Sequence, residues 1–131
     1  MITRTIFCCS CNAEVRARLT DGKEIYPHRP DLFNLPFWKC NGCGNFVGCH
    51  HKTKDSTRPL GVIPSNQVKQ LRKKLHAIID PLWKGSSDKR SARKLIYCKI
   101  SEFLGYEYHA AEIRSVEEAE RVLNFVQTEL R

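Results

Sequence analysis

Two cysteine pairs carry the clearest chemistry in this sequence. Cys8 and Cys11 form one CxxC pair, and Cys40 and Cys43 form a second. A CxxC turn points both sulfurs inward and exposes backbone amides to them, so two such turns offer four thiolates to one ion. Four thiolates satisfy tetrahedral Zn²⁺ and leave no open position for water. The pairs therefore predict one structural zinc ion, with iron as an alternative on the same sulfurs.

The turns within these pairs have residues suited to tight geometry. Gly42 and Gly44 permit the positive φ angles that such turns often need. Asn12 takes the place of glycine after the first pair, because Asn tolerates left-handed backbone. Residues 12–39 separate the pairs, more than the common spacing of about 15 to 20 residues. A hairpin and a proline-rich loop account for the excess.

Four further candidate ligands lie close to these pairs. Cys9 interrupts the first pair, and Cys49, His50 and His51 follow the second. We expect Cys49 to be a small buried side chain in a strand, with His50 on the opposite face. Replacement of one paired cysteine by Cys49 or His50 is the main competing ligand set.

The elements that position the cysteines are predicted to be short strands. Residues 13–19 alternate between apolar and polar, and the Asp-Gly pair in residues 20–23 favours a hairpin turn before a return strand at residues 24–26. A second hairpin is expected to pivot on residues 41–44. Residues 26–36 contain three prolines and predict an irregular loop.

The pattern becomes helical from residue 65 onward. An apolar stripe at three- and four-residue spacing begins at Val68, and Asp80-Pro81 is expected to kink or end this first helix. A second helix is predicted from about residue 88 to residue 104, with Gly105 as its stop signal. A third opens on a Ser115 to Glu118 capping box. The predicted buried positions of the second helix are Ala92, Ile96, Ile100 and Phe103. Those of the third are Val116, Ala119, Leu123, Val126 and Leu130.

These elements predict an α+β protein. Residues 1–64 are expected to form a zinc-ribbon-like β-hairpin module, and residues 65–131 a small basic three-helix region packed on it. Trp38 and Trp83 are expected to be packing residues. The chain has no apolar run long enough for a secretion signal or a membrane span, which predicts a reducing, cytoplasmic location.

The charge balance points to polyanionic partners. The chain has 22 Lys and Arg against 14 Asp and Glu, a net charge of +8, spread along its length. Such an excess favours nucleic acid, DNA or RNA, over a purely solubilising role. The candidate phosphate-binding residues are Arg29, Arg58, Lys69, Arg72, Lys73, Lys74, Lys89, Arg90, Arg93 and Lys94.

One loop offers a further candidate surface. Tyr26, His28, Arg29 and Asp31 lie where few apolar groups are available for packing, and His50 follows the second cysteine pair. An arginine there would contact phosphate while an exposed ring stacks on a base. We therefore expect a non-enzymatic nucleic-acid-binding or regulatory adaptor protein.

Two other functions are compatible with the sequence. One is a small nuclease or phosphoesterase using His28 and His50 as acid and base, with Arg29 or Arg58 stabilising the phosphate. The other is a phage factor that binds a host protein through acidic positions of the third helix. These are Glu117, Glu118 and Glu120.

Several long motifs resemble one family. The segments "CSCNAEV", "EIYPHRPDL", "FWKCNGCGNFVGCHHKT", "TRPLGVI", "LRKKLHAIIDPLWK" and "ISEFLGY" are similar to bacterial and phage proteins that contain a zinc-finger domain of unknown function. The resemblance covers nearly the entire chain and implies that both cysteine pairs belong to one zinc-ribbon-like module. This sequence departs from the family in Cys9, in the doubled His50-His51 and in an insertion at residues 52–56.

Overall fold

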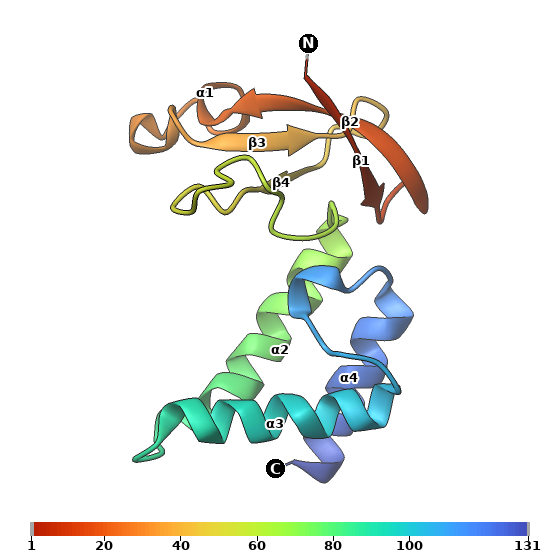
Figure 1. The fold of residues 1–131 in the computed structure, drawn as a ribbon. Coiled ribbons are helices and arrows are strands. Elements are labelled where there is room, and N and C mark those ends of the chain that lie inside the picture. Colours follow the sequence, from red (N-terminus) through yellow and green to blue (C-terminus); the bar gives the residue numbers. More distant parts are fainter. Residues whose placement is uncertain (1, 131) are drawn as a thin grey trace. The chain divides into compact units, whose positions relative to one another are not determined.

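The structure is a computed structural model that describes residues 2–130 (Figure 1). The chain divides into two compact units, with the boundary between residues 65 and 66. Every strand lies in the first unit, and the three long helices lie in the second. The α+β class predicted from the sequence is therefore confirmed. Among the described residues, no helix has both the length and the apolar composition needed to cross a bilayer.

The first unit is built on a four-stranded antiparallel sheet. Its strands are β1 (Thr3–Cys8), β2 (Ala13–Asp21), β3 (Pro36–Lys39) and β4 (Phe46–Gly48), in that spatial order. Cys8 pairs with Ala13 across β1 and β2, and Lys39 pairs with Phe46 across β3 and β4. The alternating residues 13–19 form a strand, and the hairpin around residues 41–44 forms as expected.

The first predicted hairpin turn is wrong. Residues from Gly22 to Ile25 form a short helix, α1 (Gly22–Ile25), and β2 pairs with β1 and β3 instead of with a returning strand. Asp21 caps the helix, because its Oδ1 accepts a hydrogen bond from the Glu24 N–H at 3.2 Å. A Cβ on Gly22 would lie 1.7 Å from the Leu32 carbonyl oxygen. In this chain Asp21 therefore caps a helix, and Gly22 allows the backbone to pass close to Leu32.

The core of this unit packs against the cysteines. Trp38 is 2% exposed, and its indole N–H donates to the Thr57 carbonyl at 2.6 Å, which confirms its expected packing role. Ile63 is fully buried and forms an isolated bridge with Cys8. The buried cluster comprises Ile6, Cys8, Ala17, Trp38, Cys40, Val47, Cys49 and Ile63. Residues far apart in the sequence thus surround the first cysteine of each pair.

The second unit contains α2 (Asn66–Lys84), α3 (Lys89–Leu104) and α4 (Val116–Glu129), all three in mutual contact. Asp88 caps α3 by accepting from the Ser91 N–H at 3.2 Å, and Gly105 ends it with a φ of 84°. Ser115 Oγ accepts from the Glu118 N–H at 3.1 Å at the start of α4. The predicted start and stop signals of α3 and the predicted Ser115 cap of α4 are therefore confirmed.

Two details of the helices differ from expectation. Of the two outcomes expected at Asp80-Pro81, an end to the helix is wrong, because α2 continues to Lys84 with Pro81 inside it. Ala77, whose carbonyl loses its partner at Pro81, is exposed, so water can hydrate that oxygen. Phe103 is 41% exposed and stacks on Phe125, with 4.4 Å between ring centroids, instead of being buried.

Candidate metal centre and basic surface

Four cysteine sulfurs converge at one end of the sheet. Cys8 ends β1 and Cys40 follows β3, while Cys11 and Cys43 lie in the turns that lead to β2 and β4. The Cys8 and Cys43 sulfurs are 3.4 Å apart, and those of Cys11 and Cys40 are 3.7 Å apart. All four sulfurs lie within 4.8 Å of one another. Each close contact therefore joins the first turn to the second.

These distances fit a tetrahedral ion. Zinc–sulfur bonds of about 2.3 Å place neighbouring sulfurs of a tetrahedron about 3.8 Å apart. The observed separations of 3.4 and 3.7 Å are close to this edge and far longer than a disulfide bond of about 2.05 Å. The cysteines are free thiols. The cluster fits one structural zinc ion.

Backbone amides face the sulfurs, as the CxxC motif predicts. Burial works against ionisation of Cys40, yet the N–H groups of Cys43 and Gly42 bring the pKa of its thiol below the usual value. For Cys8, burial raises the pKa to about 12, although the Cys11 N–H acts in the opposite direction. Zinc must displace these protons when it binds.

Two of the three predicted turn positions have left-handed backbone. Asn12 has a φ of 53° and Gly44 a φ of 80°. The prediction for Gly42 is wrong, because its φ is not positive and a Cβ there would meet the Cys11 sulfur at an ordinary 3.6 Å. Gly44 is the position at which glycine is needed in this turn.

The competing ligands lie outside the cluster. Among residues 2–130, neither Cys49 nor the two adjacent histidines belong to the group of sulfurs that converge. Cys49 is 5% exposed in the core, and burial raises the pKa of its thiol to about 11. Cys9 is half-buried, and its N–H donates to the Ile63 carbonyl at 2.9 Å.

Polar side chains that sequence reasoning did not identify hold the turns in place. Asn45 Nδ2 donates to Ser10 Oγ at 2.7 Å and so ties one turn to the other. Arg18 Nε donates to Asn41 Oδ1 at 3.0 Å, and its guanidinium also pairs with Glu24. Arg18 lies in the alternating pattern of β2, which indicated a strand but gave no sign of these partners.

The candidate functional loop is only partly brought together. His50 and Arg58 are adjacent, because the His50 N–H donates to the Arg58 carbonyl at 2.9 Å. The Tyr26 ring packs edge-on against Phe37 and Phe46, with centroids 5.7 and 5.6 Å away. That ring is still 37% exposed.

The other loop residues have separate contacts. Arg29 forms a two-point ion pair with Asp31, at 3.0 and 2.8 Å, which offsets its positive charge. Within residues 2–130, His28 makes no side-chain hydrogen bond or ion pair. Among the described residues, no contact therefore brings His28 and His50 together as an acid–base pair.

The four cations of α2 have different environments. Arg72 Nη2 donates to the Ala111 carbonyl at 2.8 Å and thereby holds the segment before α4. Burial lowers the pKa of Lys69, with added repulsion from Lys73 and Arg72. Lys73 and Lys74 are exposed. Two of the four are thus open to solvent, and Arg72 has a structural contact.

The first half of α3 is strongly basic and exposed. Its four cations are Lys89, Arg90, Arg93 and Lys94. The Arg93 guanidinium lies 4.6 Å from the Tyr97 ring centroid and 5.6 Å from that of Trp83. The sequence offered the i, i+4 spacing of Arg93 and Tyr97 as a signal, but the proximity to Trp83 depends on helix packing.

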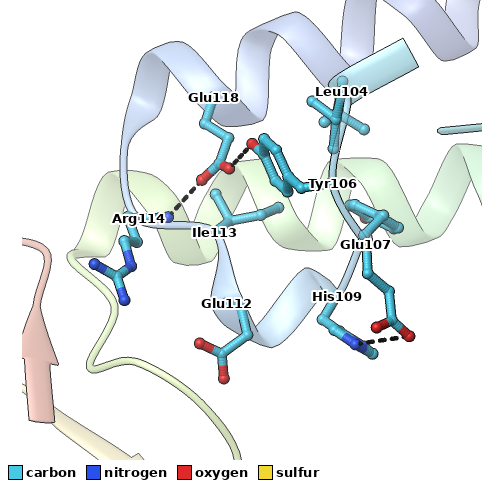
Figure 2. Close-up of a pocket in the computed structure, with 10 residues that line it drawn as sticks. Leu104, Tyr106, Glu107, His109, Glu112, Ile113, Arg114 and Glu118 are labelled. Carbon is cyan, nitrogen blue, oxygen red and sulfur yellow. Dashed lines mark hydrogen bonds and ion pairs between the residues drawn. The ribbon is translucent and has the colours of Figure 1, made fainter. Parts of the chain in front are cut away.

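The segment between α3 and α4 is braced by the start of α4. Figure 2 shows the Glu118 carboxylate between the Tyr106 hydroxyl and the Arg114 N–H, which donates at 2.8 Å. His109 pairs with Glu107 at 3.3 Å (Figure 2). These residues line a hollow of about 320 Å³. The bracing fixes the backbone on both sides of Tyr108, which lines the same hollow.

The sheet and its four converging thiols define a small zinc-finger protein. Comparison with protein families identifies the chain as a member of the family described as a zinc-finger-containing domain, whose model matches residues 4–129. Comparisons with curated proteins and with solved structures gave no significant match. Family and site together describe a zinc-stabilised protein.

Proposed function

We propose that Cys8, Cys11, Cys40 and Cys43 hold a structural zinc ion and that the protein binds nucleic acid through the basic half of α3. A four-thiolate site has no open coordination position, so the zinc stabilises the fold and takes no part in chemistry. The exposed cations of α3 supply the interaction with phosphate. Binding of phosphate by these cations does not require a cluster of acidic residues that holds a metal ion.

The placement of charge in α3 is the observation that carries the proposal. Lys89, Arg90, Arg93 and Lys94 lie in the first two turns, and no acidic residue lies in the first turn. A helix N-terminus carries a partial positive charge, so cations there oppose helix stability by a few tenths of a kcal/mol each. Asp88 at the cap offsets only part of this repulsion. Phosphate binding explains why cations occupy positions that favour acids.

Other candidate cations have partners that those of α3 lack, and this difference favours α3 as the binding surface. Arg29 is paired with Asp31, and Arg72 is bonded to the Ala111 carbonyl. Within residues 2–130, Lys89, Arg90, Arg93 and Lys94 have no carboxylate partner. Lys73, Lys74 and Arg58 are exposed and contribute further positive potential.

Salt-dependent binding of the full, zinc-loaded chain tests the proposal. Fluorescence anisotropy with a labelled oligonucleotide should show affinity falling about tenfold or more between 50 and 200 mM salt, if several phosphates are bound. The triple variant Lys89→Gln, Arg90→Gln, Lys94→Gln should weaken binding. It should also reduce the slope of log K against log salt by about one for each phosphate that the variant no longer binds.

A matched control removes the same charge elsewhere. Lys23→Gln, Lys52→Gln, Lys54→Gln alters three exposed cations of the first unit and should leave most of the affinity and the salt slope intact. An equal decrease in both triple variants would show that net charge, not α3, drives binding. Binding that is absent at low salt, or indifferent to salt, would contradict the proposal. Cleavage of the oligonucleotide during the assay would favour the nuclease alternative.

A further inference from the structure

A cavity of about 450 Å³ opens beside the basic half of α3. Three cations, Arg90, Arg93 and Lys94, line it together with two aromatic residues, Tyr97 and Tyr108. Its volume lies in the range of about 300 to 1,000 Å³ that is typical of ligand sites. Cations and rings thus line the same cavity within the second unit, and the one carboxylate among the described residues of its wall, Glu107, pairs with His109.

The arginine in this cavity is held by rings and not by an acid. Arg93 lies over Tyr97, and its Nη2 is 3.4 Å from the Tyr97 hydroxyl. Tyr97 in turn meets Tyr108 edge-on, with 5.4 Å between centroids and an interplanar angle of 74°. Stacking fixes the guanidinium while its charge stays unneutralised, which suits it to a phosphate.

A residue that lines the cavity contains a buried polar atom without a partner. Tyr108 is 3% exposed, and within residues 2–130 its hydroxyl has no hydrogen-bond partner. Burial raises the pKa of this phenol, so it remains a donor at neutral pH. An unsatisfied buried hydroxyl destabilises a fold, because it has lost its hydrogen bonds to water. The Trp83 N–H, in an adjoining hollow that shares Arg93 and Tyr97, is likewise unsatisfied.

We infer that this cavity receives the base of an unpaired nucleotide while Arg90, Arg93 and Lys94 contact the flanking phosphates, so that the protein prefers single-stranded nucleic acid. This inference rests on the proposed function. Bases in a duplex are stacked and paired, so their faces are closed to the rings and to the stacked guanidinium of this cavity. An unpaired base offers a free face for such stacking.

The first test compares a labelled single strand with its duplex on the full, zinc-loaded chain at one salt concentration. We expect the single strand to bind about tenfold more tightly, because one of its bases can stack in the cavity. Equal affinities for the single strand and the duplex, with a steep salt dependence, would overturn the inference about the cavity. Phosphate-driven binding by α3 would still stand. Failure to bind either form would overturn both proposals.

Variants of Tyr97 and Arg93 test the cavity itself. Tyr97→Leu should weaken single-strand binding about tenfold with an unchanged salt slope and unchanged duplex binding, whereas Tyr97→Phe should retain the affinity. Arg93→Lys keeps the charge but removes the planar stacking group and should weaken single-strand binding more than duplex binding. Circular dichroism identifies any variant that fails to fold, and the single substitutions Tyr97→Phe and Arg93→Lys keep the test decisive.

Two controls separate other sources of the same chemistry. Tyr26→Leu removes a partly exposed ring from the first unit and should leave single-strand binding unchanged. Weaker binding in Tyr26→Leu with full binding in Tyr97→Leu would place the base outside the cavity and overturn the inference. Free AMP that quenches tryptophan fluorescence with an affinity equal to that of the strand would indicate a small-molecule site instead of a strand-binding one.

Discussion

At the scale of single residues, Glu24 gathers the polar network beside the metal centre. Its carboxylate accepts from Arg18, Thr20 and Lys39, which come from two neighbouring strands. Arg18 continues the network to Asn41, in the second cysteine turn. These contacts lower the pKa of Glu24, with the Arg18 hydrogen bond as the largest cause. A surface carboxylate thus positions the backbone that presents Cys40 and Cys43.

Glu24→Gln should therefore weaken the first unit in a pH-dependent manner. Because the folded-state pKa lies below the value of about 4.3 in an unfolded chain, the ionised carboxylate stabilises the fold above that value. This stabilisation is lost as the pH falls from about 4.3 toward the folded pKa. Thermal melts should show a deficit of about 1 kcal/mol at pH 7 that shrinks below pH 5.

Glu14→Gln is the matched control for this prediction, because Glu14 is exposed on β2. It should leave the melting temperature within experimental error at every pH. A Glu24→Gln deficit that stayed constant down to pH 3 would show that the carboxylate does not act through its charge.

Metal content distinguishes the cysteines. Cys43→Ser should lower bound zinc from one ion per chain toward zero, because a hydroxyl is a poor zinc ligand and only three thiolates remain. Cys43 is exposed, so this effect cannot be attributed to core packing. Elemental analysis of the purified variants measures the effect directly.

Cys98→Ser and Cys49→Ser complete the comparison. Cys98 is exposed in α3 and should be neutral in both metal content and stability. Cys49 is buried, so Cys49→Ser should keep zinc while losing about 1 to 3 kcal/mol from burial of a hydroxyl. If Cys49→Ser lost its zinc while Cys43→Ser kept a full zinc ion, the ligand set would have to be different.

At the scale of elements, α1 occupies the position at which a hairpin turn was expected. Gly22 brings the backbone of α1 against the segment at Leu32, and its N–H donates to the Leu35 carbonyl at 3.0 Å. This approach places Glu24 over β2 and β3. The short helix is therefore the element that delivers the carboxylate to its partners.

Gly22→Ala should be strongly destabilising. A Cβ at this position would lie 1.7 Å from the Leu32 carbonyl oxygen, so backbone must move. We expect a decrease of about 3 kcal/mol or more in the free energy of unfolding, measured by denaturant titration. Gly85→Ala, where a Cβ meets nothing within 4 Å, should be neutral or slightly stabilising. Similar values for the two variants would contradict the close approach.

At the scale of the whole molecule, the chain consists of two units that depend on different forces. The first unit has a small core that includes two of the four converging thiols, those of Cys8 and Cys40. The second unit buries Leu75, Ile79, Ile100 and Val126 between helices. Structural zinc contributes folding free energy outright in small domains. The two units should therefore respond differently to metal removal.

Chelation of the full chain tests this difference. Hydrogen exchange after treatment with a zinc chelator should show loss of protection in β1 to β4, while amides of α2, α3 and α4 remain protected. Restoring zinc should restore the sheet. Equal loss of protection in strands and helices would mean that the halves fold as one cooperative unit and that the predicted boundary near residue 65 has no energetic meaning.

Local signals in the sequence were sufficient for several features. The two CxxC pairs predicted the converging sulfurs, and Asn12 and Gly44 their left-handed turns, because a CxxC turn and its φ preferences are decided within a few residues. The Gly105 end of α3 and the Ser115 cap of α4 were likewise predicted from a few neighbouring residues. Within the first unit, the departures were Gly42 and the hairpin turn at Asp21-Gly22.

The tertiary structure alone decided the features that depend on distant neighbours. Asp21-Gly22 suits both a hairpin turn and a helix start, and the backbone at Leu32 selects the helix. Pro81 lies within α2, where tertiary context outweighs local preference. Phe103 stacks on Phe125 at the surface, a contact between helices that its own spacing could not predict. The edge-on packing of Tyr97 and Tyr108 joins α3 to the segment beyond it. Sequence determined which groups could bind metal and phosphate, and folding determined which of them meet.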